Sequence, residues 1–111
     1  MLGCESYERY QLSLIKRLVN NGRGKEGSLS GNAIALYLHL NEGGILPNII
    51  PVIAKRLGTD EASAKKALDE LEEYGWISYG CIFRKHSTEK SLDFIQASTP
   101  EKGEKGYVER W

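Results

Sequence analysis

The residues of this chain best suited to bind another molecule are positively charged side chains gathered in a few short segments. Lys65 and Lys66 are adjacent, and a second basic group occupies the polar segment 84–90. Lysine and arginine side chains attract phosphate groups, so these residues favour a polyanion such as a nucleic acid as the ligand. The total charge gives this interpretation no support, because 15 basic residues balance 15 acidic ones.

The charge is unevenly distributed along the chain. Segment 59–75 holds two lysines against six acidic residues, a net charge of −4, whereas the segments on both sides of it are slightly positive. Lys65 and Lys66 can form ion pairs with Asp69 and Glu70 at helical spacing. A solvated, salt-bridged helix face is therefore an alternative to a binding surface.

Patterns typical of catalysis or metal binding are absent from the sequence. It has no glycine-rich phosphate loop, no arrangement of Ser, His and Asp for nucleophilic catalysis and no acidic metal cluster. We therefore expect neither an enzyme nor a bound cofactor or metal. Cys4 and Cys81 lie far apart without a CxxC partner, which indicates ordinary thiols in a reducing cytosol. His39 and His86 also lack a second ligand or base at useful spacing.

Length and composition predict one compact domain. A chain of 111 residues with 41% hydrophobic content leaves little room for a separate catalytic domain. Apolar runs such as 33–38 are too short to span a bilayer, and the N-terminus lacks the basic and then apolar layout of a signal peptide. We expect a soluble, cytoplasmic protein without a membrane partner.

Two short helices are predicted to position the lysines. Apolar residues recur at helical spacing in 49–57 and again in 60–74. Gly58 can stop the first helix in the left-handed conformation, and Thr59 can cap the second. Such a helix-turn-helix can leave its second helix exposed, which is the arrangement that a DNA major groove accommodates.

Further elements are predicted around this helix pair. A buried helix is expected at 31–41, and residues 45–46 can form a short strand. Strands at 76–83 and 91–97 would enclose the basic segment 84–90 as a β-hairpin. The expected fold class is therefore mainly α with a small β-hairpin wing (α+β), a winged helix-turn-helix with an extra N-terminal helix.

Both ends of the chain are predicted to lie outside the winged-helix domain, which would span 31–97. An amphipathic helix is expected within 1–21, and the Gly and Ser residues of 22–30 predict a flexible linker. The tail 98–111 is expected to be loosely ordered. Because the linker leaves the apolar stripe of the first helix uncovered, we predict a homodimer. The predicted dimerisation residues are Tyr7, Tyr10, Leu14 and Leu18.

Three motifs follow one another along the chain: ALYL at 35–38, IAKRLG at 53–58 and LEEYGWI at 71–77. With the hairpin that follows, they resemble the winged-helix domains of bacterial and phage regulators. They are especially similar to the N-terminal domains of phage and plasmid replication initiators and replisome organisers. The resemblance covers about two-thirds of the chain, from 28 to 97.

The resemblance implies binding of double-stranded DNA, in transcription regulation or in phage or plasmid replication initiation. The first half of the second helix would enter the major groove, because Asp69 and Glu70 farther along would repel phosphates. The alternative is a protein-interaction module whose acidic helix 60–74 faces a basic partner. The implied DNA-binding residues are Ser63, Lys65, Lys66, Lys55, Arg56, Arg84, Lys85, His86 and Lys90.

Overall fold

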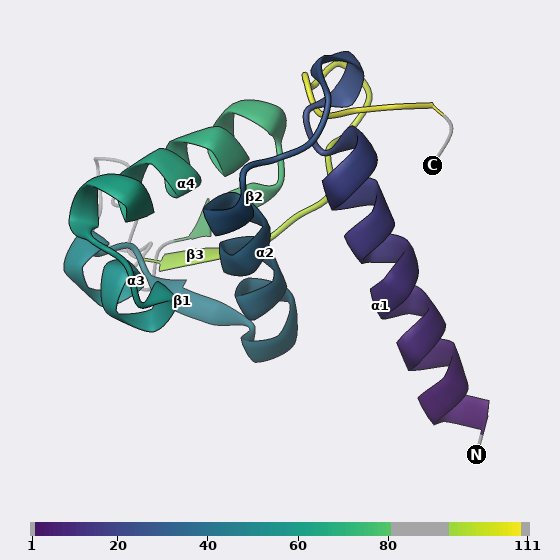
Figure 1. Ribbon diagram of the computed structural model, residues 1–111, viewed down its shortest axis with the longest axis horizontal. Helices are drawn as coiled ribbons and strands as arrows, with labels where there is room; N and C mark the ends of the chain where they lie inside the picture. The colour runs from purple at the N-terminus through teal and green to yellow at the C-terminus, as the bar shows by residue number, and fades with distance from the viewer. Residues whose placement is uncertain (1, 81–93, 110–111) are drawn as a thin grey trace.

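The fold is mainly helical with a small antiparallel sheet, which confirms the expected α+β class and the extra N-terminal helix (Figure 1). The computed structural model describes residues 2–80 and 94–109. For residues 2–8 it describes the backbone alone. The basic segment 84–90, predicted as the tip of the hairpin, thus lies outside the described residues. In chain order the elements are α1 (Leu2–Asn21), the 3-10 helix η1 (Gly24–Glu26), α2 (Gly31–Gly43), β1 (Ile45–Pro47), α3 (Ile50–Leu57), α4 (Glu61–Tyr74), β2 (Ile77–Gly80) and β3 (Phe94–Ala97).

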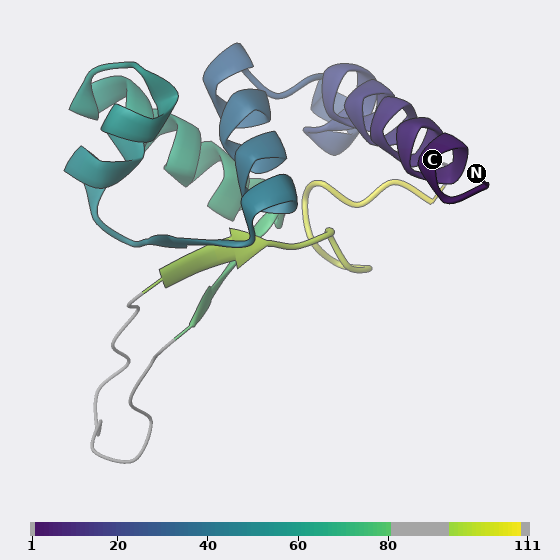
Figure 2. The same cartoon turned by 90° about the horizontal axis from the view of Figure 1, so that it is seen from below.

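The three strands form one sheet in the order β1-β3-β2, with both pairs antiparallel. Ile95 in the central strand pairs with Leu46 on one side and Tyr79 on the other, and its side chain is fully buried. The short strand expected at 45–46 is confirmed. Figure 2 shows the sheet beneath α2, which contacts β3, while α3 and α4 adjoin β1 and β2.

The helix pair follows the local signals of the sequence closely. Gly58 ends α3 in the left-handed conformation with φ 68°, and Gly75 ends α4 in the same way with φ 85°. The N-cap of α4 is Asp60 rather than Thr59, because the Asp60 carboxylate accepts the backbone N–H of Ser63 at 3.4 Å. None of the helices that the structure describes has the length and apolar character needed to cross a membrane.

Trp76 lies at the centre of the core and joins segments that are far apart in the sequence. Its ring meets that of Tyr37 edge to face, with centroids 5.2 Å apart. Its indole Nε1–H donates to the carbonyl oxygen of Gly22 at 2.6 Å. This one side chain therefore ties the end of α4 both to α2 and to the connection that follows α1.

The connection 22–30, which the sequence predicts as a flexible linker, contains η1 and is held against the core. Gly22, Gly24 and Leu29 are buried, and the Leu29 N–H donates to the carbonyl oxygen of Leu18. A Cβ at Gly22 would lie 2.6 Å from Leu18 O and from Leu29 Cγ. A Cβ at Gly24 would likewise lie 2.4 Å from Lys105 O, so glycine at these two positions reflects close approach of the backbone to its neighbours.

The described part of the tail 98–111, which the sequence predicts as loosely ordered, is attached to the end of α4. The Gly106 N–H donates to Tyr74 O at 3.1 Å, and the Ser98 N–H donates to Trp76 O at 2.9 Å. Pro100 and Gly106 are buried. The tail therefore contributes to the surroundings of the second half of α4.

Helix α1 begins at Leu2 and so spans the whole segment in which an N-terminal helix is expected. Leu14 and Leu18 are only 4% and 0% exposed, so the chain covers them with its own core and they cannot meet a second copy. This corrects their assignment to a dimer interface. Of the other two predicted dimerisation residues, Tyr10 is 53% exposed. The side chain of Tyr7 is not among those that the structure describes.

Candidate nucleic-acid interface

The first half of α4 presents its two lysines to solvent. The helix buries Ala64, Ala67 and Leu68 on its inner side, whereas Lys65 and Lys66 are exposed on the outer side. The Lys65 ammonium lies 3.6 Å from the Asp69 carboxylate in an exposed pair one turn along the helix. Such a pair contributes little to stability, so it leaves Lys65 able to exchange its partner for a phosphate.

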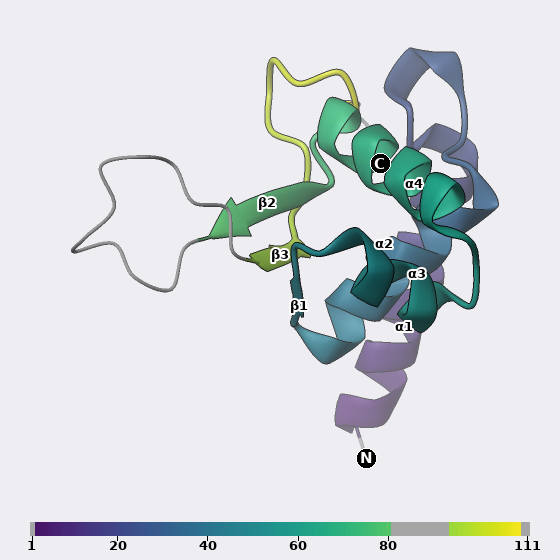
Figure 3. The same ribbon diagram turned by 90° about the vertical axis from the view of Figure 1, so that its left-hand side faces the viewer.

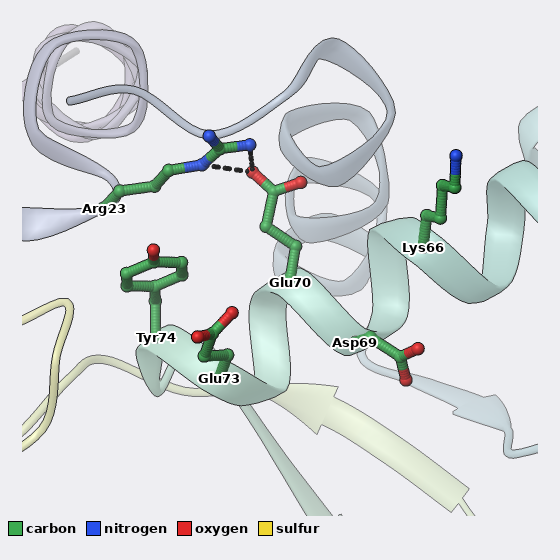
Figure 4. Close-up of a pocket in the computed structure, with 6 residues that line it drawn as sticks. All are labelled: Arg23, Lys66, Asp69, Glu70, Glu73 and Tyr74. Atoms are coloured by element: carbon green, nitrogen blue, oxygen red, sulfur yellow. Dashed lines mark hydrogen bonds and ion pairs between the residues drawn. The ribbon is translucent and has the colours of Figure 1, made fainter. Parts of the chain in front are cut away.

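Lys66 has a different environment from the one its spacing suggests. It can pair with Glu70 at helical spacing, but that carboxylate turns toward Arg23 and the lysine extends away from it (Figure 4). In the part of the chain that the structure describes, the Lys66 ammonium forms no ion pair. An exposed cation without a local counterion is suited to an anionic ligand.

The end of α3 adds further cations beside α4. Lys55 and Arg56 occupy the last turn of α3 and are exposed. Figure 3 shows α3 against α4 at the end where the connecting turn leads into α4. Cations in this turn also interact favourably with the helix dipole, which is the alternative reason for their presence. Ser63, in the first turn of α4, is half-buried.

The second half of α4 is occupied by contacts within the chain. The Glu70 carboxylate accepts Arg23 Nε–H at 2.8 Å, Arg23 Nη2–H at 2.5 Å, the Ser30 N–H at 2.7 Å and the Ser30 hydroxyl at 2.7 Å. Ser30 also caps α2, since its hydroxyl oxygen accepts the Ala33 N–H. We call Arg23, Ser30 and Glu70 the Glu70 clasp. It joins the connection after α1 and the start of α2 to α4.

The clasp holds Glu70 in its charged form. Its side chain is 13% exposed. Burial by itself raises the pKa of a carboxyl group, but the hydrogen bonds from Ser30 and Arg23 favour the ionised form more strongly and lower the Glu70 pKa overall. The hydrogen bond that Arg23 donates to Glu70 also raises the pKa of Arg23. Glu70 is therefore a half-buried anion bound within the chain and not a free surface charge.

The neighbouring acidic side chains of α4 also have partners in the chain. Glu73 accepts the Lys105 ammonium at 3.0 Å, which raises the Lys105 pKa. Glu72 accepts the Tyr79 hydroxyl at 3.0 Å, and burial together with this bond raises the Tyr79 pKa. The Tyr74 hydroxyl donates to Glu26, and this bond raises the Tyr74 pKa to about 12.

Sequence reasoning missed the contacts of Glu70, Glu73 and Tyr74 because they join residues far apart in the chain. Arg23 and Glu70 are 47 positions apart, and no local pattern connects them. Beside the clasp lies an open groove of about 380 Å³, lined by cationic and acidic groups together. It offers no nucleophile next to a base, and no metal-ligand cluster occurs among the described residues. Its lining residues are Arg23, Lys66, Asp69, Glu70, Glu73 and Tyr74.

No protein-family model matches the chain, and no curated protein is significantly similar to it in sequence. The resemblance to winged-helix regulators and replication initiators is therefore still a prediction. Of the residues that it implies, Ser63, Lys65, Lys66, Lys55 and Arg56 lie on α3 and α4. The remainder, Arg84, Lys85, His86 and Lys90, lie outside the described residues.

Proposed function

We propose that this protein binds double-stranded DNA through the first half of α4, as a winged-helix protein of transcription regulation or of phage or plasmid replication initiation. One observation carries the proposal: α4 exposes its lysines in its first half, while the carboxylates of its second half are bound by the chain itself. The helix pair α3 and α4, followed by antiparallel strands, supplies the rigid support that groove insertion needs.

The internal contacts weaken the objection raised by the negative charge of segment 59–75. Glu70 and Glu73 are paired with Arg23 and Lys105, which come from outside that segment. A paired charge produces a weaker field at a distance than an isolated one, and salt screens what is left beyond about 10 Å. A phosphate that approaches Lys66 therefore experiences less repulsion than the formal charge of −4 indicates.

The exposed positions of the first half suit an insertion that begins with the N-terminal end of α4. Ala62, Lys65 and Lys66 are exposed and share one side of the helix by their spacing of three and four positions. An alanine can contact a thymine methyl group, and lysines reach guanine or phosphate. Lys55 and Arg56 at the end of α3 would add contacts to the DNA backbone.

The alternative is an acidic helix 60–74 that binds a basic protein, and Glu70 is the acidic residue of this helix least available to a partner. Glu70 is 13% exposed and has four hydrogen bonds within the chain. Reversing its charge would break the Glu70 clasp, so such a variant cannot serve as a pure test of partner binding. Exposed acidic residues remain on α4, and of these Asp69, Glu72 and Glu73 already have partners within the chain.

Fluorescence anisotropy with a labelled duplex at low and moderate salt tests the proposal. Lys65→Ala/Lys66→Ala should lose about tenfold or more in affinity and show a salt dependence shallower by up to about two phosphate contacts. The matched control Lys25→Ala/Lys102→Ala removes two exposed lysines from another surface and should change affinity less than about twofold. Absence of binding at low salt, or equal losses in the two variants, would overturn the proposal.

A further inference from the structure

Arg23 lies in the connection between α1 and η1, outside the helix pair α3 and α4, yet it reaches the side of α4 that carries Lys66. Its Nε–H and Nη2–H both donate to the same oxygen of Glu70, at 2.8 and 2.5 Å. Arg23, Glu70 and Lys66 line one open groove (Figure 4). The groove therefore contains one carboxylate bound to a distant arginine and, one helical turn away, a lysine that has been assigned to DNA.

Helical spacing places Lys66 within reach of Glu70. The two residues are four positions apart on α4, a spacing at which opposite charges attract each other. Lys65 and Asp69 have the same spacing and do form an ion pair, at 3.6 Å. In the described part of the chain Lys66 forms no such pair, because the Glu70 clasp already holds its helical partner. The two adjacent lysines thus differ in whether their acidic neighbour is bound elsewhere.

We propose that Arg23 is a positioning residue for DNA binding, which keeps Lys66 available to a DNA phosphate by holding Glu70. This role rests on the DNA binding proposed above. Arg23 needs no contact with DNA for it, since its guanidinium group is turned to the carboxylate (Figure 4). The influence passes from the connection after α1, through Glu70, to the exposed half of α4.

The buried position of Glu70 explains why it requires a cation. Its side chain is only 13% exposed, and hydrogen bonds hold its pKa below the ordinary value, so it is ionised at neutral pH. Without Arg23, two hydrogen bonds from Ser30 would remain, but they bring no positive charge. Lys66 would then be the cation that helical spacing offers to this carboxylate. A lysine attracted to a carboxylate binds a phosphate less strongly, because the two anions compete for it.

A double-mutant cycle with a labelled duplex at low salt tests this role. Arg23→Gln should lower affinity about threefold or more and reduce the salt dependence by about one phosphate contact. In a Lys66→Ala background the same change should cost less than about 1.5-fold, because the lysine through which it acts is gone. In the matched Lys65→Ala background it should keep its full effect, since Lys65 pairs with Asp69 and not with Glu70. Equal effects in the two backgrounds would overturn the role of Arg23.

Neutralising the carboxylate is a second, independent test. Glu70→Gln added to Arg23→Gln should return affinity to within about twofold of the wild type, because an uncharged side chain no longer competes for Lys66. The control Glu101→Gln removes an equal charge from an exposed position of the tail and should leave the loss in place. Arg23→Lys, which keeps a cation beside the carboxylate, should also remain within about twofold. Equal rescue by the two glutamate changes, or rescue by neither, would contradict the proposal.

Two further readouts separate this role from loss of structure and from failure of DNA binding. Circular dichroism should show every variant folded at the temperature of the titrations, because the contacts of Ser30 with Glu70 or of Trp76 with Gly22 remain. A wild type that binds no duplex would overturn the proposed function itself. A wild type that binds, with Lys66→Ala weaker and Arg23→Gln unchanged, would overturn the role of Arg23 alone.

Discussion

The two halves of α4 belong to one helix but have opposite environments. In the first half, Lys65 and Lys66 extend into solvent, and the helix buries only small or aliphatic side chains beneath them. In the second half, Glu70, Glu73 and Tyr74 are bound by residues from η1, its flanking loop and the tail. The charge of a helix therefore predicts a binding surface only once the partners of each side chain are known.

Removing the anchor at the end of α4 should have the largest effect on stability. Trp76→Ala should lower the free energy of unfolding by about 3–5 kcal/mol, because it deletes a fully buried ring and frees the Gly22 carbonyl group. In the first half, Lys66→Ala should change stability by less than about 0.5 kcal/mol, since the side chain is exposed. Urea denaturation measures both. A comparable loss of stability in the two variants would contradict the difference between the exposed first half of α4 and its anchored end.

Filling the space at Gly22 should have the next largest effect. Gly22→Ala should lower the free energy of unfolding by about 1–3 kcal/mol, because the new methyl group would overlap Leu18 O and Leu29 Cγ. Gly31→Ala is the control, since no atom lies within 4 Å of a Cβ there, and it should be neutral or slightly stabilising. Thermal unfolding of both variants distinguishes a packed connection from a flexible linker, for which the two would behave alike.

Within α4, adjacent acidic residues should differ in their contribution. Glu70→Ala should cost about 1–2 kcal/mol, since it leaves the donors of Arg23 and Ser30 without their acceptor. Asp69→Ala removes only an exposed ion pair with Lys65 and should cost about 0–0.5 kcal/mol. Denaturant titrations at neutral pH measure the difference. Equal costs would mean that the Glu70 clasp does not stabilise the fold.

The pH dependence of the clasp should be the smallest measurable effect. Because the pKa of Glu70 is lower in the folded chain than its ordinary value, the ionised carboxylate stabilises the fold above that ordinary value. This contribution is lost as the pH falls through the lower, folded-state pKa. The stability advantage of the wild type over Glu70→Gln should therefore shrink between neutral pH and about pH 3. Parallel acid-unfolding curves for the two proteins would contradict this prediction.

The sequence predicts elements whose signals are local and misses contacts that are not. Gly58, Gly75 and the apolar spacing between them define α3 and α4 within a residue or two, because helix caps and helical faces depend on near neighbours. Gly22 has two possible meanings, flexibility or close approach, and only its neighbours in space decide between them. In the same way, the stripe through Leu14 and Leu18 predicts that something covers it, but not that the chain does so itself.

The candidate site is predictable to a similar extent. The exposure of Lys65 and Lys66 follows from helical spacing, since the apolar residues around them identify the inner side of α4. The partner of Glu70 does not follow from spacing. Helical geometry favours Lys66, whereas the fold brings Arg23 and Ser30 to that carboxylate from 47 and 40 positions away.

The most direct test of the division of α4 is an NMR titration of the ¹⁵N-labelled protein with duplex DNA at low ionic strength. Binding through the first half predicts that the largest amide shifts fall within 55–66, at the end of α3 and the start of α4. Amides at 70–76 should shift little, because the surrounding chain already occupies that half. Shifts centred on 70–76, or no shifts where electrostatic attraction is strongest, would contradict the account.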